Sequence, residues 1–226
     1  MNSIKVFSPA SVSNVCCGFD VLGFSIEGFG DELIITESNL NKVKIIKVNG
    51  YEVPISNEMN TASVAAQSLL DFLNIHSGFD IEINKNIKPG SGIGSSAASA
   101  VGAVYGINEL LGSPLKKQDL LEFAMQGEFV SSKTAPADNV ASSLYGGLIL
   151  VNNRENYNVI ELPVPKNLYA IIHHPQLEIK TSDSRGFLPE KVDLKIASEQ
   201  LASIGGFIHS LHTGDFDLMR LILKDY

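Results

Sequence analysis

Residues 88–100 read K-P-G-S-G-I-G-S-S-A-A-S-A, with glycine at three alternate positions before a serine pair and a run of small residues. Residues 79–87 before this run are largely alternating and apolar, and residues 97–111 after it have a helical pattern. The expected order is therefore strand, glycine-rich loop, helix. Glycine lets backbone N–H groups turn toward an anion, and a helix N-terminus carries about half a positive charge. Ser95 and Ser96 are suited to cap the helix and to offer hydroxyls to phosphate or a metal. We expect an anion site here; a plain flexible loop is the alternative.

The composition is that of a globular chain that can bury a core. Its 226 residues are 44% hydrophobic and 19% charged, which allows one large domain or two small ones. The formal net charge of −8 provides no basic surface for nucleic acid, although local N–H groups could still hold a nucleotide.

Localisation follows from what the sequence lacks. No apolar run approaches the ~20 residues that cross a bilayer, and the N-terminus has no cationic segment followed by an apolar one. Cys16 and Cys17 are neighbours, which rarely bridge each other, and no Cys and His spacing suggests zinc. We therefore expect a soluble chain of the reducing cytoplasm, with no membrane or nucleic-acid partner.

The apolar pattern predicts a mixture of strands and helices. Strands are expected at residues 3–7, 31–37, 43–48, 79–84, 148–151, 158–162 and 168–173. Helices are expected at residues 60–73, 96–111, 117–130, 192–211 and 215–223. Residues 8–20 are rich in Ser, Asn, Gly and Asp and predict a loop near a sheet edge, whereas the turn at 39–41 predicts a hairpin of its flanking strands. Prolines at 163 and 165 mark a domain boundary, and the chain ends in a helical pattern without a capping glycine, which suggests a truncated domain.

Acidic side chains after the loop are candidates for a metal site. Glu128 lies ten residues before the pair Asp138 and Asn139. Hard cations such as Mg²⁺ take oxygen ligands and usually keep waters and phosphates, so a carboxylate near a phosphate loop fits magnesium. A solvated Glu128 on its helix is the alternative. His173 and His174 have no obvious carboxylate partner, so we expect packed or exposed histidines there rather than a base or a ligand.

Common nucleotide-binding patterns fit this loop poorly. No Gly-Lys-Ser/Thr follows the glycines, which excludes a lysine-anchored phosphate loop, and the protein-kinase motifs are missing. The spacing G-x-G-x-G-S-S, with no strand acid about twenty residues on, also departs from the dinucleotide-binding pattern.

Four segments in chain order resemble motifs of the GHMP kinases, a superfamily that includes galactokinase and the homoserine, mevalonate and phosphomevalonate kinases. Residues 88–98 resemble the phosphate motif P-x-x-x-G-L-G-S-S-A-A, with Lys88 at the proline position and Ile93 in place of leucine. Within the superfamily the chain is most similar to the homoserine kinase branch. Its N-terminal motif, its H-A-D-N-V-A-P…G-G segment and its T-x-x-A-R-x-x-L-P loop are resembled by residues 8–23, 136–147 and 181–189.

The resemblance implies an α+β fold of two parts. Residues 1–163 would form an N-terminal ATP-binding α/β domain like the second domain of a small-subunit ribosomal protein. Residues 164–226 would begin a ferredoxin-like C-terminal domain that is incomplete here, because the family's third motif is absent.

The resemblance also implies a site for ATP, Mg²⁺ and L-homoserine. The triphosphate would lie on the phosphate motif, which comprises Lys88, Pro89, Gly90, Ser91, Gly92, Ile93, Gly94, Ser95, Ser96, Ala97 and Ala98. Mg²⁺ would be held by Glu128 with Ser95 or Ser96. The amino acid would be held by Asn14, Asp20, Thr181 and Arg185. Its ammonium suits Asp20, and its carboxylate suits the guanidinium fork of Arg185. Asp138 and Asn139 would lie near the accepting hydroxyl.

The predicted reaction is ATP-dependent phosphorylation of L-homoserine to O-phospho-L-homoserine, in threonine biosynthesis. Such a transfer depends mainly on positioning and charge stabilisation. Pro136 stands where the branch usually has histidine, which removes one substrate hydrogen bond and, with the missing third motif, leaves the activity of this chain open. The alternatives are another superfamily kinase acting on a mevalonate-type alcohol, and an inactive fragment that binds ATP. The family also suggests a homodimer.

Overall fold

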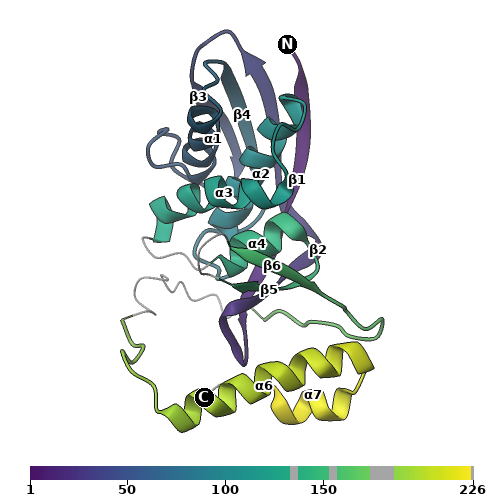
Figure 1. Cartoon of the computed structure of the whole chain (residues 1–226). Helices are drawn as coiled ribbons and strands as arrows, with labels where there is room; N and C mark the ends of the chain where they lie inside the picture. The colour runs from purple at the N-terminus through teal and green to yellow at the C-terminus, as the bar shows by residue number, and fades with distance from the viewer. Residues whose placement is uncertain (133–136, 153–156, 174–185, 225–226) are drawn as a thin grey trace.

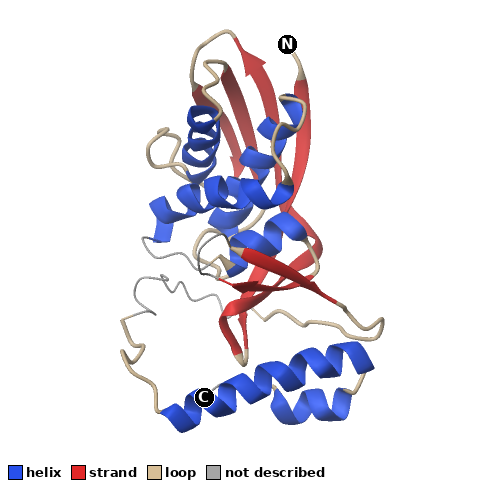
Figure 2. Ribbon diagram, in the orientation of Figure 1, coloured by secondary structure: helices blue, strands red, loops and turns tan. Residues whose placement is uncertain are grey.

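The computed structural model describes residues 1–132, 137–152, 157–173 and 186–224. These residues form a six-stranded sheet with helices, so the fold is α+β as predicted (Figure 2). Figure 1 shows the helices α1 to α4 gathered beside the sheet, and α6 and α7 lying together at the other end of the molecule. No helix among the described residues is both long enough and apolar enough to cross a membrane.

One long strand organises the sheet. β2 (Gly18–Ser38) pairs antiparallel with β1 (Ser3–Val15) along most of its length. Its other edge pairs with β4 (Gly78–Lys85) through residues 32–38 and with β5 (Leu148–Asn152) through residues 22–24. β3 (Val43–Gly50) adds to β4 in parallel, and β6 (Asn158–Leu162) adds to β5 antiparallel. In the strand order β3-β4-β2-β5-β6, the C-terminal part of β2 therefore lies beside β4, and its N-terminal part lies beside β5.

The helices cover one face of the sheet because every second strand residue there is apolar. Leu33 and Ile35 of β2 and Phe79, Ile81 and Ile83 of β4 are almost fully buried in one large apolar cluster. The same cluster takes the apolar sides of α1 (Thr61–Phe72), α2 (Ser95–Leu110), α3 (Lys117–Ser132) and α4 (Asp138–Tyr145). Of these helices only α4 is not among the predicted ones.

A second apolar cluster joins one end of the sheet to the last two helices of the chain. Leu22 of β2 and Leu162 of β6 pack there with Phe207 and Leu211 of α6 (Leu194–Thr213) and with Met219 of α7 (Phe216–Ile222). Asp193 caps the start of α6 through Lys195 N, and Gly214 ends it in the left-handed conformation. Both helices agree with the sequence prediction.

Residues 8–20 do not form the predicted loop. β1 continues to Val15 and β2 begins at Gly18, so most of this segment is a long hairpin. Its serines suit a strand because their hydroxyls have polar partners on the helical face: Ser8 Oγ lies 3.2 Å from Ser143 Oγ of α4. The pattern of small polar residues that suggests a loop is instead a polar stripe of a buried strand.

The predicted hairpin between residues 31–37 and 43–48 is also wrong. β2 and β3 are not neighbours, because β4 lies between them. The turn at residues 39–41 is placed so that Leu40 O approaches the start of β4, where only glycine fits: a Cβ on Gly78 would lie 1.4 Å from that oxygen. The later strand therefore inserts between two that are adjacent in sequence.

Residues 168–173 are described but form no strand. Tyr169 and Ile171 are 83% and 95% exposed, so the alternating apolar pattern has no sheet to pack against in the part of the chain that the structure describes. The prediction of a strand there is wrong.

Candidate active site

The phosphate motif folds as a glycine loop that ends at the start of a helix. Gly90, Gly92 and Gly94 all have positive φ, at 72°, 76° and 67°, which L side chains rarely adopt. Gly94 is the N-cap of α2, and no side chain caps that helix. The predicted capping by Ser95 or Ser96 is therefore wrong, because both hydroxyls are used elsewhere. The N–H groups of the first turn are consequently not taken by a capping side chain, which is the state that anion binding requires.

The two serines connect the loop to other elements. Ser95 Oγ donates to Ile87 O at 2.9 Å, across the base of the loop. Ser96 Oγ donates to Glu128 Oε1 on α3 at 2.9 Å. The structure thus brings together the two residues that the sequence pairs as magnesium ligands.

Glu128 has an unusual electrostatic environment. Its Oε2 has no solvent contact although the residue is partly exposed. Burial raises the pKa of this carboxyl group; hydrogen bonds from Ser96 and Ser131 and the charge of Lys85 oppose the rise, and the Asp138 carboxylate adds to it. A cation at this place would relieve the cost of keeping the carboxylate ionised.

Asn139 is oriented from both ends of its amide. Its Oδ1 accepts from Ser11 Oγ at 2.9 Å, and its Nδ2 donates to Ser13 Oγ at 2.9 Å. Asp138 beside it is fully buried, and its Oδ1 accepts from Asn139 N at 2.9 Å. Asn139 is only partly buried, so of the two side chains it is the more accessible.

Ser11 connects this amide to the glycine loop. Its N–H donates to Ile93 O at 3.1 Å, and a Cβ on Gly94 would lie 2.1 Å from Ser11 Oγ and 3.2 Å from Asn139 Oδ1. We call Ser13, Asn139, Ser11 and the loop at Gly94 the hydrogen-bonded line. It places the start of α4 directly against the phosphate motif.

Asn14 and Asp20 meet at the far end of this line. Asn14 follows Ser13, and its Oδ1 accepts from Asp20 N at 2.9 Å across the β1–β2 turn. Both have positive φ, at 55° and 59°, as does Cys16 between them at 44°. Asn and Asp tolerate this region better than most residues, so the turn is a local reason for their presence in addition to any role in binding.

The sequence prediction omits Ser11 and Ser13, which are central to the line. The available signal was their spacing: alternate residues of a strand share a face, so two serines at that spacing can reach one partner. Thr181, Arg185, Pro136 and His174 lie outside the described residues. His173 is described and exposed.

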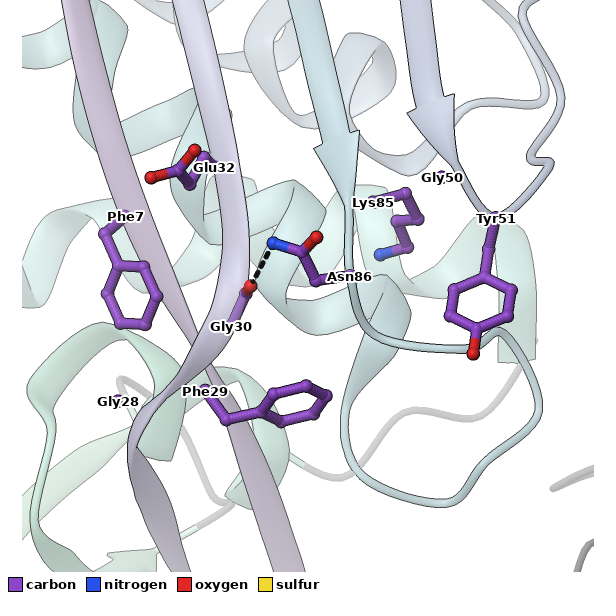
Figure 3. A pocket seen from close by; sticks show the side chains of 9 residues that line it. All are labelled: Phe7, Gly28, Phe29, Gly30, Glu32, Gly50, Tyr51, Lys85 and Asn86. Atoms are coloured by element: carbon purple, nitrogen blue, oxygen red, sulfur yellow. Dashed lines mark hydrogen bonds between the residues drawn. The ribbon is translucent and has the colours of Figure 1, made fainter.

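A cavity of about 690 Å³ is lined in part by Lys85 and Asn86 at the end of β4, and none of the predicted site residues that the structure describes is in its wall. Phe7, Phe29 and Tyr51 contribute aromatic rings to it, as Figure 3 shows. Asn86 Nδ2 donates to Gly30 O at 2.9 Å on its wall. The hydrogen-bonded line, not this cavity, brings together the residues suited to phosphate chemistry.

The sheet with its helical layer and the glycine loop that begins α2 fit the arrangement expected of a GHMP kinase. Residues 60–147 match the family model described as the GHMP kinases N terminal domain. The chain is 37% identical to a homoserine kinase of Chlorobium phaeobacteroides over 237 aligned positions, covering all of this chain and 74% of the relative. A homoserine kinase of Methanococcus maripaludis is 33% identical, with 100% and 75% covered. The crystal structure of homoserine kinase from Cytophaga hutchinsonii is 45% identical, with a TM-score of 0.94 over 100% of this chain and 72% of that one. The chain therefore belongs to the homoserine kinase family.

More distant structures share the fold alone. Mevalonate kinase of L. major, solved with R-mevalonate, has a TM-score of 0.66 at 16% identity, over 97% of this chain and 72% of that one.

Proposed function

We propose that this chain is a homoserine kinase, a transferase that moves the γ-phosphoryl group of ATP to the side-chain hydroxyl of L-homoserine and yields O-phospho-L-homoserine for threonine biosynthesis. Membership of the homoserine kinase family supports the substrate assignment. The observation that carries the chemistry is the hydrogen-bonded line, since it joins the glycine loop at Gly94 to Asn139 and, through Ser13, to the turn that holds Asn14 and Asp20. A phosphate donor and a hydroxyl acceptor would meet along such a line.

In this proposal the glycine loop binds the triphosphate of ATP. Backbone N–H groups of the glycine loop and of the start of α2 would supply the positive field that a Walker lysine supplies elsewhere. The three left-handed glycines support this role, because their backbone can face an anion without a side chain in the way.

Mg²⁺ would be held by the Glu128 carboxylate and the Ser96 hydroxyl. Oxygen donors of this kind suit the ion, which would take phosphate oxygens and water at its remaining positions and neutralise charge on the phosphates. The described residues contain no group of three or more His, Cys, Asp or Glu side chains placed for a metal.

The amino acid would lie between the β1–β2 turn and the start of α4. Asp20 would pair with its ammonium, Asn14 would donate to its carboxylate, and Asn139 would orient the accepting hydroxyl. Asp138 would accept the proton that leaves this hydroxyl, with its Oδ1 oriented by the hydrogen bond from Asn139 N. Thr181 and Arg185, which lie outside the described residues, would complete the proposed site.

The domain division also forms part of the proposal. We assign residues 1–163 to the ATP-binding domain and residues 164–226 to the beginning of the C-terminal domain, in a cytoplasmic enzyme that forms homodimers. The second apolar cluster, in which Leu162 packs with Phe207, would be the contact between the two parts.

A coupled assay tests the function directly. The chain is supplied with ATP and Mg²⁺ and with homoserine, mevalonate, galactose or serine in turn. We expect a higher kcat/KM for homoserine than for the other three compounds. Turnover of another alcohol without turnover of homoserine would contradict the substrate assignment. Calorimetric binding of ATP and homoserine without any turnover would instead identify an inactive nucleotide-binding chain.

A further inference from the structure

A lysine occupies a core position at the end of β4. Phe79, Ile81 and Ile83 alternate along this strand toward the helical layer, and the next inward position is Lys85, which is 1% exposed. An apolar side chain would continue the pattern. The ammonium group is therefore buried at a place where hydrophobic packing alone gives no reason for a charge.

Every N–H of this ammonium has a partner. Lys85 Nζ donates to Asp31 Oδ2 at 2.5 Å, to Ser95 O at 2.5 Å and to Ser99 Oγ at 2.8 Å. A lysine ammonium has three donors and no acceptor, so a carboxylate, a carbonyl and a hydroxyl satisfy it completely. Burial lowers the pKa of Lys85, and the adjacent Asp31 carboxylate opposes that change.

The other oxygen of Asp31 holds the opposite end of the glycine loop. Asp31 Oδ1 accepts from Asn86 N and from Ile87 N, each at 2.9 Å. Ser95 Oγ in turn donates to Ile87 O at 2.9 Å. Residue 87, where the chain leaves β4, and residue 95, where it enters α2, are therefore joined both directly and through the buried ion pair.

The loop between these anchors is held by few bonds of its own. Ser91 N donates to Lys88 O at 3.2 Å, and Ile93 O accepts from Ser11 N at 3.1 Å. In the middle of the loop, an added Cβ on Gly92 would meet nothing within 4 Å, so the backbone there has little packing to hold it. Its shape thus depends strongly on how far apart its two ends are held.

We propose that Lys85 and Asp31 are positioning residues, which set the width of the loop's base and so the aim of its N–H groups at the phosphates of a nucleotide. The inference rests on the proposed nucleotide-binding function of that loop. A buried ion pair is weak support for stability, since well-packed apolar residues often replace one without loss. What apolar residues cannot replace here are the bonds to Ser95 O and to the two backbone N–H groups.

The decisive variant is Asp31→Asn with Lys85→Met, which removes both charges together and leaves no buried charge unpaired. The introduced asparagine amide can still accept from the two backbone N–H groups, and the methionine fills the volume of the lysine stem, but the bond to Ser95 O is lost. We expect a folded protein whose Kd for Mg·ADP, measured by calorimetry, rises about tenfold or more, equivalent to ~1.4 kcal/mol. The KM for ATP should rise in parallel while the KM for homoserine stays within about twofold.

Ile81→Val is the matched control. It lies on the same strand and faces the same core, but its apolar side chain makes no hydrogen bond to the loop ends, so the variant should lower the thermal midpoint and leave the Kd for Mg·ADP unchanged. A double variant that is folded and binds Mg·ADP as tightly as the control would overturn the inference.

Ser99→Ala carries the test if the double variant does not fold. It removes one partner of Lys85 from a position inside α2, one turn after the start of the helix, where alanine is favourable, and should raise the Kd for Mg·ADP about two- to fivefold. An unchanged Kd would overturn the inference. If the unaltered chain itself binds no Mg·ADP, the proposed function falls and this inference with it, whereas equal binding by wild type and folded variants removes the inference alone.

Discussion

Gly94 is the residue at which backbone conformation and packing constrain the loop together. Its φ of 67° disfavours any β-branched residue, and an added Cβ would lie 2.1 Å from Ser11 Oγ. We predict that Gly94→Val weakens Mg·ADP binding at least about a hundredfold, because the valine displaces Ser11 and with it the hydrogen-bonded line. Calorimetry with Mg·ADP measures this, and circular dichroism should show a largely intact fold.

Gly112→Ala provides the reference for conformational strain alone. Gly112 has a φ of 81° with nothing within 4 Å of an added Cβ, and it lies at the far end of α2 from the loop. This variant should be somewhat less stable but bind Mg·ADP normally. If Gly94→Val also binds normally, the loop is not the phosphate site.

Glu128 gives a pH-dependent prediction. Because its pKa is raised in the folded chain, the folded state holds a proton that the unfolded state releases, and stability without metal falls as pH rises from the ordinary glutamate value of about 4.3 through the raised pKa. Glu128→Gln, whose amide oxygen can still accept from Ser96, removes this loss. We predict a higher thermal midpoint than wild type at neutral pH in chelator, and no such gain near pH 4.

With magnesium present, we expect the opposite order for activity: wild type should be more active than Glu128→Gln. Mg²⁺ competes with the proton for the carboxylate, so wild-type kcat/KM should decline as pH falls through the raised pKa. Glu128→Gln should lose about a hundredfold or more in kcat/KM at saturating Mg²⁺. Wild-type activity in the variant would remove Glu128 from the metal site.

At the scale of elements, the packing of α6 on α7 gives a matched pair of glycines. An added Cβ on Gly205 meets nothing within 4 Å, whereas one on Gly206 would lie 2.9 Å from Ile222 Cδ1 of α7. We predict that Gly205→Ala stabilises the chain by about 0.5–1 kcal/mol, because alanine loses less backbone entropy than glycine in a helix. Gly206→Ala should give no gain or a loss, since Ile222 must move. Urea unfolding of both variants checks this, and equal gains would contradict the α6–α7 contact.

The elements also separate what sequence reasoning can predict from what it cannot. Helices such as α1, where Asn60 Oδ1 accepts from Ala62 N and Ser63 N, carry their own signals and were predictable. Strand partners were not, because β4 enters between β2 and β3 through contacts that no local pattern encodes. The long hairpin was missed for a related reason: small polar residues favour loops until a helix elsewhere in the chain supplies partners, as Ser143 does for Ser8.

The candidate site shows the same division. The glycine loop and the pairing of Ser96 with Glu128 could be predicted because the sequence resembles the GHMP kinase motifs, whereas spacing alone left Glu128 open to being a solvated helix residue. Lys85 and Asp31 could not be, since only the fold shows that a charged residue at an apolar register position lies 2.5 Å from a carboxylate 54 positions away. A single sequence carries no local signal that tells which distant residues will contact each other in the fold.

At the scale of the whole molecule, β2 links two apolar clusters with different tasks. Its Leu33 and Ile35 belong to the cluster that packs α1 to α4 on the sheet, including α2 at the end of the glycine loop, and its Leu22 belongs to the cluster that receives α6. The nucleotide and amino-acid halves of the proposed site therefore rest on different parts of the core. Substitutions in α6 should therefore affect the binding of the amino acid more than the binding of the nucleotide.

Gln200 tests this separation most directly. Its Nε2 donates to Cys17 O at 2.5 Å, so α6 holds the β1–β2 turn between Asn14 and Asp20. We predict that Gln200→Ala raises the KM for homoserine about fivefold, the change expected from ~1 kcal/mol for one lost hydrogen bond, and leaves the KM for ATP unchanged. Gln67→Ala, which removes only an exposed bond to Asp71 on α1, should change neither constant. A parallel rise of both KM values in Gln200→Ala would mean that the turn and the glycine loop move as one unit, because the hydrogen-bonded line through Asn139 would then be transmitting the displacement.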